Sequence, residues 1–132
     1  CIKAFRVRDE GWLDEIHRWL AALDSCGGRG NLAGVLLDAF SLAARGGSGQ
    51  KFNWTMVADA RISGKLAGVD PIILAGGLDA TCVGTAIETV RPWAVDVASG
   101  VEKAPGVKDL RKVADFIRAT KEGDELKSEF WL

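Results

Sequence analysis

Residues 71–77 read Pro-Ile-Ile-Leu-Ala-Gly-Gly, a short apolar run that ends in a pair of glycines. Such a run, bounded by a turn signal, is typical of a strand buried on both faces, as the strands of parallel sheets are. Working outward, further strands are predicted at residues 1–8, 32–37 and 94–97. A helix is predicted after each strand, at residues 12–23, 54–62, 80–90 and 107–120. Strand and helix thus alternate four times, which predicts an α/β fold with four parallel strands.

The length of 132 residues fits a single domain. We expect residues 1–121 to form that domain and the mostly polar residues 122–132 to form a loose tail. Within the first strand, Ile2 and Ala4 alternate with charged residues. In the third helix Thr81 is a candidate N-cap, and in the fourth the inward side chains include Phe116 and Ile117.

Composition excludes several classes of function. The chain has 17 Lys and Arg against 18 Asp and Glu, so there is no basic excess to bind a nucleic acid. No apolar run approaches the ~18 residues that a membrane span needs. The three cysteines are odd in number and lack metal-ligand spacing, which predicts no metal site and a reducing, cytoplasmic location.

Polar and glycine residues follow three of the predicted strands, at the end where parallel α/β folds bind ligands. Gly76-Gly77 allows close backbone approach to a ligand, and Ser99-Gly100 adds a hydroxyl. Each pair alone is more often an ordinary turn. Together, one strand–helix unit apart, they favour an anion site for a phosphate group.

Asp38 directly follows the apolar run Val35–Leu37. An apolar core beside a carboxyl disfavours its charged form, which suits a general acid, but an Asp that caps the next loop is an equally good interpretation. The glycine-rich residues 46–49 lack the pattern of a nucleotide phosphate loop and could be an active-site loop or a plain turn.

Several segments of the chain closely resemble one family, the phosphoribosylanthranilate isomerases. The most specific are ILAGGL at 73–78, RPWAVDVASGVE at 91–102 and PGVKD at 105–109. Segments IKAFRV at 2–7, LLD at 36–38 and GGSGQKFNW at 46–54 resemble it in the same order, and the match continues to about Thr120.

The resemblance implies a (β/α)₈ barrel that converts N-(5-phosphoribosyl)anthranilate, by an Amadori rearrangement in tryptophan biosynthesis, without cofactor or metal. It implies that Asp38 is the general acid that opens the ribose ring. The phosphate of this small-molecule substrate would be held by Gly76, Gly77, Ser99 and Gly100. The substrate loop would contain Gly47, Ser48 and Gly49, and Asp96 would be structural or contact a substrate hydroxyl.

The resemblance covers only strands five to eight of that barrel, the carboxyl-terminal (βα)₅–₈ half. The family's catalytic base, a cysteine on strand one, and its anthranilate-facing arginine on strand two have no counterpart in this sequence. The resemblance therefore implies that this chain is inactive alone and that it pairs with an N-terminal half-barrel or with a second copy of itself. The alternative is a non-catalytic, phosphate-binding half-barrel that assembles with a partner.

Overall fold

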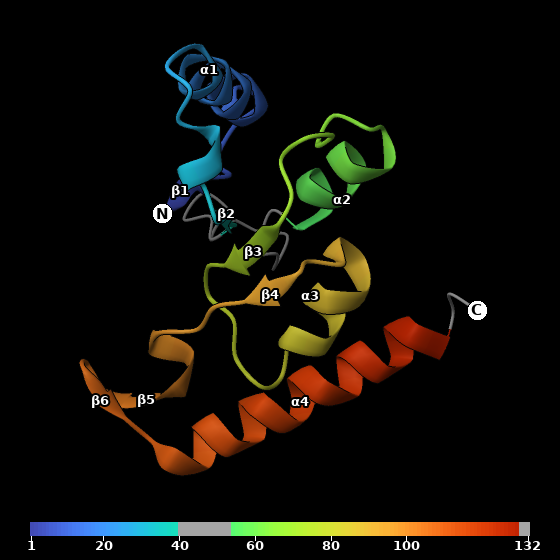
Figure 1. Ribbon diagram of the computed structural model, residues 1–132. Helices are drawn as coiled ribbons and strands as arrows, with labels where there is room; N and C mark the ends of the chain where they lie inside the picture. The colour runs from blue at the N-terminus through green and yellow to red at the C-terminus, as the bar shows by residue number, and fades with distance from the viewer. Residues whose placement is uncertain (40–53, 130–132) are drawn as a thin grey trace.

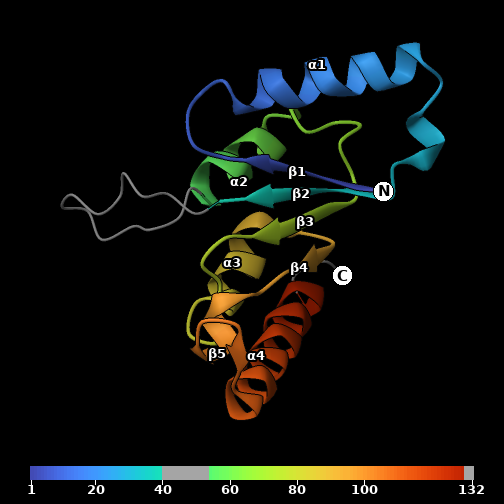
Figure 2. The ribbon, with the colours of Figure 1, turned by 90° about the vertical axis from the view of Figure 1, so that its left-hand side faces the viewer.

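The computed structural model describes residues 1–39 and 54–129, and side chains as far as residue 126. Its centre is a four-stranded sheet with the strand order β1-β2-β3-β4. The strands are β1 (Ile2–Arg6), β2 (Gly34–Asp38), β3 (Ile72–Ala75) and β4 (Ala94–Val95). Every neighbouring pair is parallel, and Figure 2 shows the arrowheads of β1, β2 and β3 at one end of the sheet. The prediction of an α/β fold with four parallel strands is confirmed.

A helix follows each strand and packs on one side of the sheet (Figure 1). The helices are α1 (Trp12–Ser25), α2 (Trp54–Ile62), α3 (Val83–Val90) and α4 (Leu110–Glu129). Two 3₁₀ turns, η1 (Arg29–Asn31) and η3 (Ser99–Val101), and an antiparallel hairpin of β5 (Glu102–Ala104) and β6 (Val107–Lys108) complete the described elements. The predicted bounds of α2 are those observed, whereas the hairpin was not predicted.

Alternate residues of each strand point to opposite faces of the sheet. The face toward the helices, here called the outer face, includes Val35, Leu37, Ile72 and Leu74, each 0% exposed. On the opposite, inner face exposure rises toward β1: Ile73 is 9% exposed and Ile2 is 57% exposed. In β1 the buried side chain is therefore Phe5, on the outer face, and neither Ile2 nor Ala4 is buried.

The expected loose tail from residue 122 is wrong, because α4 continues through Glu129. Gly123 of α4 is buried against α3, where a Cβ on it would lie 3.1 Å from Cα of Gly84 and 3.4 Å from Ile87. Because Gly123 has no side chain, α4 can pass close to the backbone of α3 at Gly84, and this packing extends α4 past the polar sequence. Phe116 is buried as predicted, but Ile117 is 49% exposed.

Within residues 1–39 and 54–129, no helix is long and apolar enough to cross a membrane. The same residues contain no cluster of three His, Cys, Asp or Glu side chains arranged to hold a metal ion.

Candidate active site

The carboxyl ends of β2, β3 and β4 open into one cleft of about 250 Å³. Residues 38, 75 and 96 lie at neighbouring strand ends: Asp38 pairs in register with Ala75, and the Asp96 amide donates to the carbonyl of Leu74 over 2.8 Å. The lining residues are Leu36, Asp38, Ala75, Gly76, Gly77, Leu78, Asp96, Val97, Ala98, Ser99 and Gly100. The structure thus brings the sequence-predicted residues of three strand ends together.

The turn after β3 depends on the conformational freedom of two glycines. Gly76 has a φ of 99° and Gly77 a φ of 67°, in the left-handed region that other residues rarely adopt. The turn leads through Leu78, which is 1% exposed, toward the N-terminus of α3. A bare backbone at this position exposes peptide groups to the cleft without an intervening side chain.

Gly100 has a different requirement from Gly76 and Gly77. A Cβ on Gly100 would lie 1.9 Å from the carbonyl oxygen of Leu78 and 3.2 Å from Cβ of Asp79. The turn after β4 therefore packs directly on the turn after β3. This contact joins the Gly76-Gly77 and Ser99-Gly100 pairs into a single wall of the cleft.

Asp79 organises the entry into α3. Its Oδ1 accepts hydrogen bonds from the amides of Thr81 (2.8 Å) and Cys82 (3.2 Å), and from the Thr81 hydroxyl. Partial burial alone would raise the pKa of Asp79, but these hydrogen bonds from Thr81 and Cys82 outweigh it and hold the pKa below the ordinary value of 3.8. Thr81 is thus not the N-cap expected from sequence, because its hydroxyl binds Asp79.

Cys82 lies behind the same turn. Its Sγ accepts the Asp79 amide over 3.3 Å and contacts the carbonyl of Gly77 at 3.8 Å. Burial raises the pKa of the Cys82 thiol, as does the neighbouring charge of Asp79. The thiol is therefore a packing group for the turn rather than an activated nucleophile.

Asp38 stands at the end of β2 with Arg6 of β1 beside it. The two residues are paired in register, and Nε of Arg6 lies 3.7 Å from the Asp38 carboxylate. The Asp38 side chain is 33% exposed and lies beside this guanidinium. Arg6 was not among the residues predicted near the cleft, although its place at the end of a parallel strand was a signal.

The β5–β6 hairpin was also missed, and it braces the turn after β4. Lys108 donates to the carbonyl of Ala98 over 2.8 Å and to Oε1 of Glu102 over 2.9 Å. The side chains of Ser99 and Asp96 are exposed. The predicted loop residues Gly47, Ser48 and Gly49 lie outside the described residues.

Comparison with known proteins identifies where this architecture recurs. The family model described as N-(5′-phosphoribosyl)anthranilate (PRA) isomerase matches residues 15–119. A curated N-(5′-phosphoribosyl)anthranilate isomerase of Geobacter sulfurreducens is 47% identical over 120 residues, which cover 91% of this chain and 51% of the relative. The chain therefore spans about half the length of the curated relatives it matches.

Solved structures agree with the sequence relatives. Phosphoribosyl anthranilate isomerase from Thermotoga maritima superposes with a TM-score of 0.63 at 34% identity, covering 92% of this chain and 51% of that one. A second such structure was solved in complex with reduced 1-(o-carboxyphenylamino)-1-deoxyribulose 5-phosphate. It superposes with a TM-score of 0.61 at 31% identity, covering 92% of this chain and 48% of that one.

Proposed function

The chain belongs to the N-(5′-phosphoribosyl)anthranilate isomerase family, and on that premise we propose that it is the carboxyl-terminal half of such an isomerase. The activity proposed for the assembled enzyme is the Amadori rearrangement of N-(5-phosphoribosyl)anthranilate to 1-(2-carboxyphenylamino)-1-deoxyribulose 5-phosphate in tryptophan biosynthesis. The observation that carries this proposal is the cleft that Asp38 shares with two glycine-containing turns.

The two sides of the cleft divide the chemistry between binding and proton transfer. The Gly76-Gly77 and Ser99-Gly100 turns would hold the substrate phosphate through backbone amides, since bare peptide groups in turns form anion sites. Asp38 would protonate the ribose ring oxygen and so open the ring to a Schiff base. A second group must then remove the C2′ proton, and the resulting enolamine tautomerises to the ketone.

That second group would come from the other half of the barrel. The thiol nearest the cleft, Cys82, packs behind the Gly77 turn instead of lining the cleft. This placement supports a division in which the present chain supplies the acid and the phosphate site but not the base. It also supports the expectation that the chain alone has only background activity.

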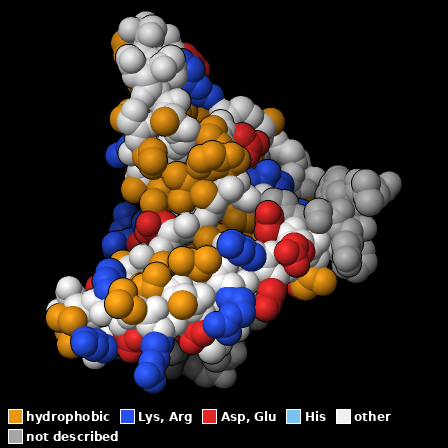
Figure 3. All heavy atoms as spheres, turned by 60° about the horizontal axis from the view of Figure 1, so that its bottom comes forward, with side chains coloured by type: hydrophobic (Ala, Val, Ile, Leu, Met, Phe, Trp, Pro, Cys, Tyr) orange, Lys and Arg blue, Asp and Glu red, His pale blue; other side chains and the backbone are white. Residues whose placement is uncertain are grey.

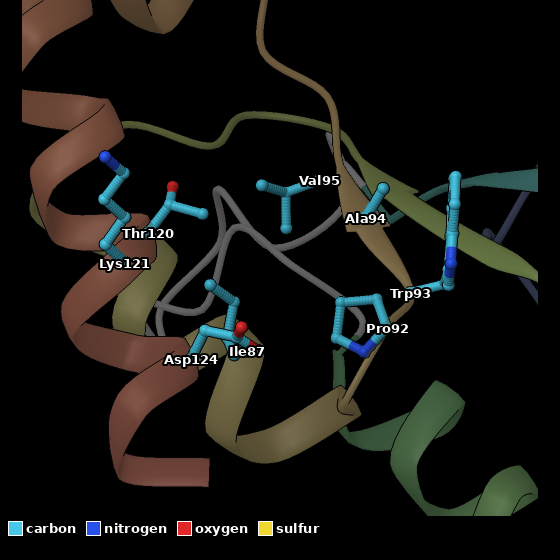
Figure 4. A pocket seen from close by; sticks show the side chains of 8 residues that line it. All are labelled: Ile87, Pro92, Trp93, Ala94, Val95, Thr120, Lys121 and Asp124. Atoms are coloured by element: carbon cyan, nitrogen blue, oxygen red, sulfur yellow. The ribbon is translucent and has the colours of Figure 1, made fainter. Parts of the chain in front are cut away.

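Apolar surface beside the edge of β4, which is the last strand of the sheet among the described residues, supports assembly with another half-barrel. Trp93, directly before β4, is 73% exposed, and Figure 3, seen from the side of α4, shows hydrophobic side chains gathered in patches. A pocket of about 160 Å³ opens next to this edge, between β4 and the helices α3 and α4 (Figure 4). In it, Thr120 and Asp124 of α4 face Ile87 of α3, with Trp93 on the far side.

Unpaired edge strands and apolar surface of this kind drive association. An added strand at β4, followed by its own helix, would cover both the edge and the pocket. We propose the N-terminal half-barrel as this partner, with a second copy of the chain as the substitute when that half is absent. The three free thiols, Cys1, Cys26 and Cys82, favour a cytoplasmic location.

A complementation experiment tests the proposal. The 132-residue chain is assayed for loss of substrate fluorescence, alone and with a polypeptide that carries strands one to four of a relative. We expect background turnover and self-association on gel filtration for the chain alone, and restored turnover with the partner. A chain carrying Asp38→Asn, mixed with the same partner, is the matched control. A monomer that turns over substrate by itself would refute the half-barrel proposal, and phosphate binding without restored turnover would favour a non-catalytic half-barrel.

A further inference from the structure

The carbonyl groups around the turn after β4 are engaged by donors from the following hairpin and helix. Nζ of Lys108 donates to the carbonyl of Ala98, immediately before η3, over 2.8 Å. The amide of Asp109 donates to the carbonyl of Val101 over 2.8 Å, and Nζ of Lys112 donates to the carbonyl of Glu102 over 2.8 Å. Within the turn, the carbonyl of Ser99 accepts the amide at the end of η3.

These bonds direct the carbonyl oxygens of the turn toward the hairpin. Peptide carbonyl and amide groups point in opposite directions, so carbonyls held on the hairpin side leave amides of Ser99 and Gly100 turned the other way. The oxygens of these carbonyls would repel an anion in the cleft. Their attachment to cationic and amide donors removes that repulsion and places the charge of Lys108 behind the turn.

Glu102 holds Lys108 in this position. Its Oε1 accepts the Lys108 ammonium at 2.9 Å and its Oε2 accepts the amide of Gly106 at 3.2 Å. The Glu102 side chain is only 18% exposed, whereas that of Lys108 is 47% exposed. The hydrogen bond from Lys108, followed by that from Gly106, lowers the pKa of Glu102.

We propose that Lys108 is a positioning residue for the substrate phosphate, acting through the Ala98 carbonyl to set the direction of the Ser99-Gly100 turn. This inference rests on the proposed function, because it concerns the same phosphate site. Lys108 need not touch the phosphate. Its contribution is to fix the direction of the exposed backbone of this turn through the Ala98 carbonyl.

The test measures binding of inorganic phosphate to the 132-residue chain by ³¹P NMR titration. Lys108→Met removes both hydrogen bonds, and Lys103→Met removes an exposed lysine of the same hairpin. We expect about tenfold weaker binding for Lys108→Met, since hydrogen bonds to charged groups are the stronger class, and unchanged binding for Lys103→Met. Lys108→Arg keeps the charge and the donors and should restore most of the affinity.

Gly77→Val shows whether phosphate binds at the proposed site, because its side chain blocks the approach of phosphate to the backbone. This variant should therefore show no phosphate binding in the ³¹P NMR titration. Wild-type binding that Gly77→Val does not remove would overturn the proposed phosphate site and this inference with it. If Gly77→Val removes phosphate binding but Lys108→Met leaves it unchanged, this inference alone is overturned. Equal losses of affinity for Lys103→Met and Lys108→Met would overturn it as well. Circular dichroism checks each fold, and if Lys108→Met does not fold, Lys108→Gln is judged by the same criterion.

Discussion

The outer and inner faces of the sheet are built from alternate residues of the same four strands, yet within residues 1–39 and 54–129 the helices cover only the outer one (Figure 1). On β2, Leu37 points outward and is 0% exposed, whereas its neighbours Leu36 and Asp38 point inward and are only partly buried. At the β1 edge the contrast is larger, with Val7 at 0% and Ile2 at 57% exposed.

Within a single strand, the residues of the outer face therefore serve stability, and those of the inner face serve the proposed chemistry. The outer face is completed by α1, α2 and α3 from the same chain, so its packing energy is available to the chain alone. The inner face carries Asp38 and leads into the cleft, and it is the face that the proposed partner would complete. Substitutions at adjacent positions of one strand should therefore have effects of different kinds.

The largest effect is expected on turnover, at Asp38. In the complemented enzyme, Asp38→Asn removes the transferable proton while keeping the shape, and kcat should fall by ~10²–10⁴, the usual contribution of acid–base catalysis. Because Asp38 is one-third exposed, the variant should fold normally. Asp59→Asn, an exposed carboxylate of α2, is the control and should turn over like the wild type. Near wild-type turnover by Asp38→Asn would show that Asp38 is not the general acid.

The next effect is on stability, at the residue beside it. Leu37→Ala opens a cavity in the covered outer face and should lower the free energy of unfolding by about 3 kcal/mol. Leu36→Ala deletes the same atoms from the partly exposed inner face and should cost less than about 1.5 kcal/mol. Urea denaturation at low protein concentration measures both. Equal losses would show that the inner face is as fully packed as the outer one.

The strands could be predicted because three of the four are local apolar runs with turn signals of their own, as in Pro71–Gly77, and the first alternates apolar with charged residues. The end of α4 could not, because it depends on Gly123 meeting Gly84 of another helix, a contact that composition does not encode. The short β5–β6 hairpin could not be predicted from the sequence either. Its two strands are held by Lys108 and Glu102, which in the sequence are ordinary charged residues.

The position of the site followed from one rule, that strand ends of a parallel sheet meet at one edge. The rule and the family resemblance together brought Asp38, Gly76 and Ser99 to one cleft. Neither indicated what holds the cleft in shape. The Arg6–Asp38 pair depends on strand register, and the Gly100–Leu78 contact depends on how two turns pack, so both required coordinates.

That second contact gives the third prediction. Gly100→Ala would put a Cβ 1.9 Å from the Leu78 carbonyl oxygen, so the two turns must separate, at a cost of about 1–3 kcal/mol. Gly84→Ala is the matched control: apart from its chain neighbours and the backbone of α3, no described atom lies within 4 Å of a Cβ built there, and an alanine inside α3 should stabilise by roughly 0.5–1 kcal/mol. Thermal denaturation compares the two. A neutral Gly100→Ala would mean that the turns are not interlocked in solution.

The smallest effect is expected at Asp79, where the cleft wall joins α3, and it depends on pH. Asp79→Ala removes the acceptor for the amides of Thr81 and Cys82 and should lower the free energy of unfolding at pH 7 by about 1 kcal/mol, as for a lost helix cap. These hydrogen bonds hold the pKa of Asp79 below 3.8 in the folded state. The carboxylate therefore stabilises the fold fully above pH 3.8, and this contribution is lost as the pH falls through the lower, folded value. The difference between wild type and variant, followed by urea denaturation across the acid range, should shrink below pH 3.8. A difference that stays constant there would show that the loss comes from the shape of the side chain and not from its charge.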